Sequence, residues 1–175
     1  MAPLEHLGAF HSGLLHPLLT PTHALGLFGL GLLVGQQPPG NRLLPQLLFL
    51  LALGGGLLAL AFAVGETPAS DVLLIAVAIS GALVAAGFPL PRPPLSALAA
   101  AMGAAVGLDS PPEVISYQAA VIMLIGSGVG AALVLAIVAA ITSRMRRDWQ
   151  RIGVRVLGSW TAASALLAIA VRFAK

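Results

Sequence analysis

The sequence predicts an all-α membrane protein, a polytopic helical bundle with about six transmembrane helices and a first helix broken by prolines. Of the 175 residues, 58% are hydrophobic and only 9% are charged, and the mean hydropathy is +0.99. Soluble globular domains do not show this composition. The apolar residues form long runs rather than stripes opposite a polar face, and short joints with Pro, Gly or charged residues separate the runs. We therefore expect a single integral membrane domain over residues 1–175.

The first predicted span is the most irregular. It covers about Leu14–Gly35 and contains Pro17 and Pro21 near its start. Each proline lacks a backbone N–H donor and tends to kink or break a helix. We therefore expect irregular turns at the outer end of this span.

Five further spans follow the first. The second carries Gly54, Gly55 and Gly56 at its middle, where the missing side chains allow close helix contact or a bend. The fourth has only ~15 residues, too few to cross a bilayer upright without local thinning or a partner, so a re-entrant course is the alternative. The fifth is long and is expected to be tilted. The approximate bounds are Leu43–Val64, Asp71–Phe88, Pro94–Leu108, Val114–Thr142 and Val154–Phe173.

The distribution of charge predicts the orientation of the chain. Lys and Arg collect on the cytoplasmic side of membrane proteins. The first, third and fifth connections hold most of the arginines, whereas the acidic residues lie mainly in the other connections. We therefore expect a multi-pass protein of the bacterial inner (cytoplasmic) membrane, retained whole, with both termini on the periplasmic side. The arginines concerned are Arg42, Arg92, Arg144, Arg146, Arg147 and Arg151, with Arg155 just inside the sixth span.

Three of the four histidines lie in the stretch FHSGLLHPLLTPTH at the start of the first span. Neutral imidazole is a good ligand for divalent nickel, cobalt, copper or zinc. On an ideal helix His16 and His23 would share a face but lie ~10 Å apart along the axis, too far for one ion. An unwound turn at the prolines would shorten this gap, and we therefore take His11, His16 and His23 as candidate metal ligands. The alternative is that they are interfacial histidines that only hydrogen-bond to headgroups or backbone.

The residues around these histidines resemble a known family. The run HSGLLHP, followed by His23 and ALGLFGLGLLVG, is similar to the first-helix signature of the HupE/UreJ family, small nickel/cobalt permeases associated with hydrogenases and ureases. The family pattern has a His-Gly pair, then His-Pro, two variable residues, Gly, one variable residue and Asp-His. His16, Pro17 and His23 match this pattern, whereas Thr20 replaces the Gly and Thr22 replaces the Asp.

A second resemblance lies in the fourth span. The stretch MGAAVGLDSP resembles the family pattern of His-Gly, two residues, His-Gly, one residue and an acid. Gly103, Gly107 and Asp109 keep their places, but Met102 and Val106 stand where the family has histidines. The C-terminal stretch RIGVRVLGSWTAASALLAIA also resembles the end of the family's chains.

The resemblance implies a divergent permease that passes Ni²⁺ or Co²⁺ as its transported ion, with no other cofactor expected. The outward-facing site would comprise His11, His16 and His23, with Thr22, Met102 and Asp109 as weaker candidates. A threonine cannot supply the negative charge that a carboxylate offers to a dication in a medium of low dielectric constant. The alternative is therefore a structural or accessory subunit of a larger membrane complex that is built on a permease-like scaffold and does not transport.

Two of the weaker candidates have other interpretations. Met102 would favour a soft ion, but a lone thioether more often packs in a core. Asp109, which precedes Ser110 and two prolines, is also typical of a solvated loop acid or a helix-end cap. These alternatives stay open at the level of sequence.

Other function classes find little support. The sequence lacks a P-loop, a Gly-x-Ser-x-Gly elbow and a zincin motif, so we do not expect an enzyme. The pI near 10.7 reflects arginines that flank apolar spans, so nucleic acid is not an expected partner. Among these arginines, Asp148-Trp149-Gln150 is expected to form an interfacial loop. The expected partners are the lipid bilayer and either further copies of the chain or other membrane subunits.

Glycine pairs spaced four residues apart predict close helix packing within the bundle or between subunits: Gly31 and Gly35, Gly103 and Gly107, Gly126 and Gly130.

Overall fold

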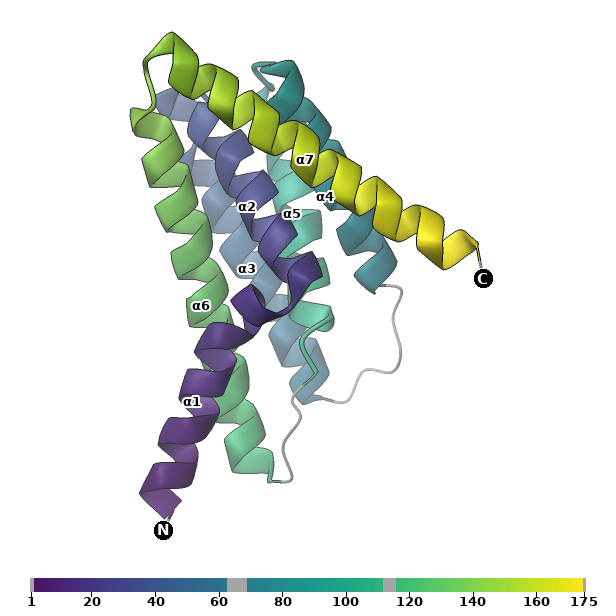
Figure 1. The fold of residues 1–175 in the computed structure, drawn as a ribbon. Coiled ribbons are helices and arrows are strands. Elements are labelled where there is room, and N and C mark those ends of the chain that lie inside the picture. Colours follow the sequence, from purple (N-terminus) through teal and green to yellow (C-terminus); the bar gives the residue numbers. More distant parts are fainter. Residues whose placement is uncertain (1, 63–68, 112–115, 175) are drawn as a thin grey trace.

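The computed structural model of the chain describes residues 2–62, 69–111 and 116–174, and side chains from residue 8 onward. Within these ranges every regular element is helical (Figure 1). The elements are α1 (Ala2–Leu19), α2 (Pro21–Gln36), the 3-10 helix η1 (Pro39–Asn41), α3 (Leu43–Ala61), α4 (Ala69–Ala86), α5 (Arg92–Leu108), α6 (Tyr117–Arg144) and α7 (Asp148–Phe173). The predicted all-α class is confirmed. The predicted end of the second span at Val64 and the predicted start of the fifth at Val114 lie outside the described residues.

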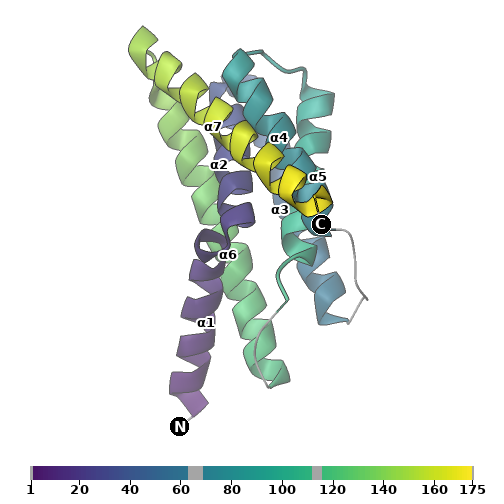
Figure 2. The same cartoon turned by 45° about the vertical axis from the view of Figure 1, so that its right-hand side comes forward.

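The helices alternate in direction once α1 and α2 are counted together. Figures 1 and 2 show α2, α4 and α6 running toward one end of the bundle and α3, α5 and α7 running back. Among the described residues, four helices are long and apolar enough to cross a membrane, and the bent α1–α2 pair would be a fifth span. α5 is a continuous helix of 17 residues, which is at the lower limit of about 17 for crossing. The prediction of a helical membrane protein with about six spans agrees with this arrangement.

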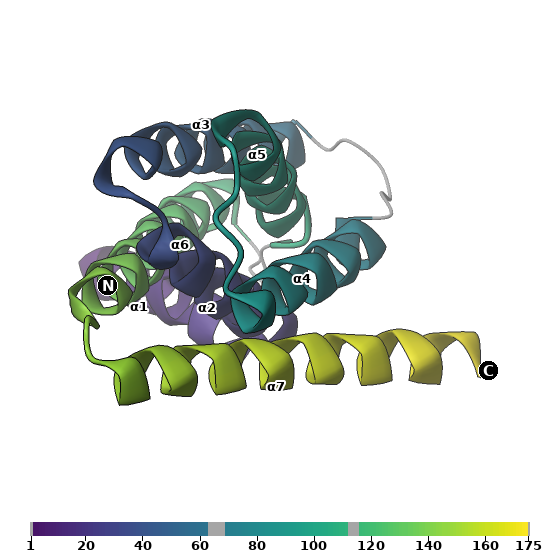
Figure 3. The same cartoon turned by 90° about the horizontal axis from the view of Figure 1, so that it is seen from above.

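The last helix begins earlier than the sequence pattern suggested. We expected Asp148-Trp149-Gln150 to be a loop before a span at Val154, but these residues form the first turn of α7. Gln150 Oε1 accepts hydrogen bonds from the backbone N–H groups of Arg146 and Arg147, each at 3.1 Å. Polar capping of this kind satisfies N–H groups near a helix start, so the arginine-rich joint is shorter than predicted. Figure 3 shows α7 lying steeply inclined across the other helices.

Glycines hold neighbouring helices in backbone contact. A Cβ at Gly107 of α5 would lie 2.6 Å from the Leu53 carbonyl oxygen of α3, and one at Gly56 would lie 2.8 Å from the Ala104 carbonyl oxygen. By contrast, Gly54 and Gly55 face open space, and α3 continues through them without a break. Of the three central glycines, only Gly56 thus serves close packing.

The other glycine pairs also pack within the chain. Gly126 and Gly130 of α6 lie against the α1 backbone at Phe10 and Leu14. Gly31 and Gly35 of α2 lie against Val138 and Thr142 further along α6. Each of the three predicted pairs therefore joins two helices of one bundle, as small residues at four-residue spacing do in membranes.

α2 is the central helix. It packs against α4, α5, α6 and α7, and Leu27, Leu30 and Leu33 are fully buried. Large apolar side chains also cover the outside of the bundle, where Leu51 is 71% exposed and Trp160 68%. Lipid acyl chains are as apolar as these side chains. The exposed apolar surface is therefore the lipid-facing side of the spans.

Candidate metal-ion site

The first span is broken at Thr20, as the prolines predicted. The axes of α1 and α2 meet at 70°, and Thr20 has extended backbone angles, φ −88° and ψ 109°. Pro21 takes the first position of α2, where its missing N–H has no intrahelical partner to lose. The Thr20 N–H still bonds the His16 carbonyl at 3.0 Å, and Ala24 N–H bonds the Thr20 carbonyl at 3.0 Å. The break is therefore one residue wide.

Pro17 creates a second polar requirement inside α1. Because it has no N–H, the carbonyl of Gly13, four residues earlier, lacks its helical donor. Ser127 of α6 donates its hydroxyl to this carbonyl at 3.2 Å. Gly13 makes the approach of α6 possible, since a Cβ there would overlap the Met123 carbonyl. Nothing in the sequence near Ser127 indicates this role, although a proline inside a helix frees the carbonyl four residues earlier and so predicts that some donor must serve it.

The bend brings His16 and His23 together. Their ring centroids lie 5.4 Å apart with the ring planes at 75°, whereas a straight helix would separate them by about 10 Å along its axis. His23 is completely buried and His16 is half-buried. Two imidazoles therefore share one region at the break.

Asp109 reaches this region from another helix. Its Oδ2 lies 3.1 Å from His23 Nε2, across 86 positions of sequence. Asp109 occupies the C-cap of α5, its side chain is 27% exposed, and the buried Ser110 hydroxyl beside it donates to the Val106 carbonyl at 2.7 Å. His23 Nδ1 is buried and has no hydrogen-bond partner among the described residues. Asp109 is thus a helix-end residue, as one alternative held, but its carboxylate faces a buried imidazole.

Three candidates remain: His11, Thr22 and Met102. His11 is exposed on α1 and contacts the Phe10 ring edge-on at 6.1 Å between centroids; it precedes His16 by five residues, a rotation of about 140° on a helix. Thr22 is half-buried in the first turn of α2. Met102 is fully buried, and its Sδ lies 3.5 Å from where a Cβ at Gly26 would be, among core side chains. The core-packing interpretation fits Met102 best.

The structure therefore brings His16, His23 and Asp109 together, whereas His11 lies more than one helical turn before His16 on α1. Within the part of the chain that the structure describes, no three His, Asp or Glu side chains are arranged to hold a metal ion by themselves. A cation bound here would draw its remaining ligands from backbone carbonyls, water or a rearranged Asp109. Hard and borderline dications commonly accept such mixed oxygen and nitrogen ligands.

Fold and site together define a polytopic helical membrane protein in which a buried histidine contacts an aspartate beside a break in the first span. The chain belongs to the HupE/UreJ family, because the family model described as HupE / UreJ protein matches residues 2–168. The match includes the bend and the two segments that carry the histidine–aspartate pair. No curated protein and no solved structure matches the chain significantly.

Proposed function

We propose that this protein is a permease for a transition-metal cation, nickel or cobalt, and that the ion binds at His23 and His16, with Asp109 as the carboxylate that orients His23. The observation that carries the proposal is the state of the two His23 nitrogens. Nε2 lies 3.1 Å from the Asp109 carboxylate, whereas Nδ1 is buried with no partner among the described residues.

This arrangement prepares an imidazole for metal binding. The neutral tautomer that carries its proton on Nε2 donates to Asp109 Oδ2 and leaves a lone pair on Nδ1. Metal-binding histidines commonly donate their second ring N–H to a carboxylate, which fixes the tautomer and raises the basicity of the ligating nitrogen. The His16 ring, 5.4 Å away between centroids, supports a second imidazole ligand on the same ion.

Asp109 also answers the charge problem that Thr22 raises. A dication that enters a region of low dielectric constant needs a negative charge nearby. In the family pattern a carboxylate precedes the last histidine of the first helix, and here Thr22 stands in its place. Asp109 supplies a carboxylate to the same histidine from α5. In this proposal the exposed His11, nearer the outer end of α1, makes the first contact with incoming ions.

Uptake of radioactive nickel or cobalt by cells that express the chain tests the proposal. We expect the double substitution His16→Ala with His23→Ala to reduce uptake to that of cells without the protein, and His11→Ala alone to reduce it less. Protein content and elution as a single species in detergent must match the wild type, so that loss of folding is recognised. Uptake that survives the double substitution would overturn the proposal.

The accessory-subunit alternative rests on a different observation. Met102 and Val106, which stand where the family pattern has histidines, are 0% and 1% exposed within an apolar core. These positions therefore contribute packing instead of ligands. If cells with the wild-type chain take up no more nickel or cobalt than cells without it, the accessory role is favoured.

A further inference from the structure

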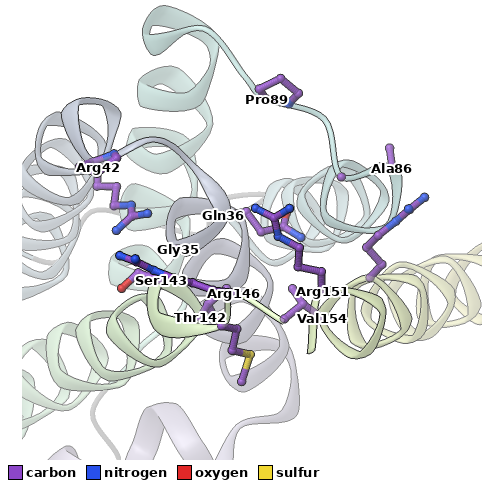
Figure 4. Close-up of a pocket in the computed structure, with 14 residues that line it drawn as sticks. Gly35, Gln36, Arg42, Ala86, Pro89, Thr142, Ser143, Arg146, Arg151 and Val154 are labelled. Carbon is purple, nitrogen blue, oxygen red and sulfur yellow. The ribbon is translucent and has the colours of Figure 1, made fainter. Parts of the chain in front are cut away.

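A cavity of about 660 Å³ lies at the end of the bundle opposite the His23–Asp109 pair. The ends of α2, α4 and α6, the turn before α3 and the first turns of α7 enclose it (Figure 4). Its volume falls within the ~300–1,000 Å³ typical of small-molecule sites. The cavity contains none of the residues of the proposed metal site.

Four arginines line this cavity: Arg42, Arg146, Arg151 and Arg155. They come from the turn before α3, the α6–α7 joint and α7, and Figure 4 shows Arg42, Arg146 and Arg151 reaching into the enclosed region from these separate segments. No lining residue is acidic. Among the described residues, the arginine–carboxylate ion pair lies elsewhere, between Asp71 and Arg172.

Two of the arginines are held in place by the backbone. Arg42 Nε donates to the Gln37 carbonyl at 2.6 Å, and Arg155 Nε donates to the Ala85 carbonyl at 2.8 Å. Gln37 is itself buried. Its side chain donates to the Leu33 carbonyl at 3.1 Å and accepts from the Leu90 N–H at 2.9 Å. Helix-end carbonyls therefore account for one N–H of each of these two guanidinium groups.

Most of the donor capacity of the cluster is unused. A guanidinium has five N–H donors, so Arg42 and Arg155 keep their terminal Nη groups. Within the described ranges no hydrogen bond is formed by these Nη groups or by the Arg146 and Arg151 guanidinium groups. Four like charges around one cavity repel one another unless an anion lies between them. Arginine pairs with phosphate through two parallel hydrogen bonds, which makes phosphate the anion best matched to several convergent guanidinium groups.

We propose that this cavity binds a phosphate-bearing anion, and that the headgroup of an anionic phospholipid of the cytoplasmic leaflet is its source. The positive-inside rule places this end of the bundle in the cytoplasm, where anionic headgroups lie at the same level as basic pockets between transmembrane helices. Trp149 and Ile152, in the first turns of α7, are 66% and 61% exposed. Apolar and aromatic side chains beside the cluster suit a ligand whose phosphate is joined to acyl chains.

Thermal unfolding of the purified full-length chain in dodecyl maltoside tests the proposal. We expect cardiolipin or phosphatidylglycerol to raise the Tm by about 5 °C, and phosphatidylcholine, whose phosphate is balanced by an ammonium group, to raise it much less. The double substitution Arg146→Gln with Arg151→Gln should abolish the rise. Arg144→Gln with Arg147→Gln is the matched control. It also removes two positive charges from the joint between α6 and α7, but neither residue lines the cavity.

The control decides whether the cavity or the general surface charge is responsible. An equal loss of the shift in both double variants, or no shift in the wild type, would overturn the site. A second arm adds inorganic phosphate or pyrophosphate without lipid. A shift there that depends on Arg146 and Arg151 supports a phosphate site filled from solution, whereas a shift with anionic lipid alone supports the headgroup.

Discussion

Burying an imidazole completely costs free energy unless its nitrogens find partners, and His23 is 0% exposed with one nitrogen on Asp109. The other nitrogen, Nδ1, finds no partner among the residues described. A buried nitrogen without a hydrogen-bond partner lowers the stability of the fold, so packing alone does not explain a histidine at this position. Since intramembrane ionisable residues that face a bundle interior tend to mark ion pathways, His23 is the residue on which the proposed function depends most.

At this scale, Asp109→Asn is the sharpest single change. Asparagine keeps the shape of the side chain and an acceptor oxygen but removes the negative charge that supports His23. We expect the affinity for nickel or cobalt to fall about 10- to 100-fold, as for other carboxylates behind metal-binding histidines. Isothermal titration of the purified chain in detergent measures this affinity.

Asp71→Asn is the control for that measurement. Asp71 is exposed, and its ion pair with Arg172 lies near the C-terminal end of α7, so its loss should leave the metal affinity unchanged and cost little stability. Equal affinities for the wild type and Asp109→Asn would show that Asp109 is only a helix-end residue.

At the scale of elements, the α1–α2 break is what converts a sequence pattern into a site. Pro21 starts α2 without a donor, and Pro17 leaves the Gly13 carbonyl to Ser127. α6 supports both halves, because its first half packs on α1 and its second half on α2. The 70° bend is therefore fixed by tertiary contacts as well as by proline chemistry.

Restoring the backbone donors should straighten this element. We expect Pro17→Ala with Pro21→Ala to move residues 12 and 28 toward the ~24 Å Cα separation of a continuous helix and to weaken metal binding. The chain has no cysteine, so spin labels at Ser12→Cys and Phe28→Cys, both exposed positions, report the distance by double electron–electron resonance. Pro39→Ala in η1 serves as the control. An unchanged distance in the double variant would show that packing alone holds the bend.

At the scale of the whole molecule, the two ends of the bundle differ in charge. The cavity end carries Arg42, Arg146, Arg151 and Arg155 without an acidic lining residue. The opposite end carries Asp109 beside His23 and the Asp71–Arg172 pair. This asymmetry predicts that the arginine end is cytoplasmic and that the proposed metal site opens outward.

Cysteine labelling checks this orientation. A membrane-impermeant maleimide added to intact cells should label Tyr117→Cys, which is 73% exposed at the start of α6, and should spare Gly40→Cys in η1. After the cells are permeabilised, both variants should react. Labelling of Gly40→Cys in intact cells would show that the orientation is the opposite of the predicted one, with the arginine cavity outside.

Several features could be predicted from single segments. The glycine pairs, the broken first helix and the arginine-bearing joints were all visible, because each depends on spacing or on the chemistry of neighbouring residues. The start of α7 was predicted late, since the charged residues Asp148 and Arg151 suggested a loop where Gln150 instead caps a helix. Asp109 was noted only as a weaker candidate, because nothing local to it shows which side chain it faces.

The sequence by itself determined the membrane class, the proline break and the separation of charge along the chain, because apolar run length, missing backbone donors and arginine position act locally. Only the tertiary structure decided that His23 meets Asp109 across 86 positions, that Ser127 serves the carbonyl freed by Pro17, and that arginines from separate segments surround one cavity. These contacts depend on which helices pack together, and glycines at the interfaces allow that packing through backbone contacts whose partners no single segment specifies.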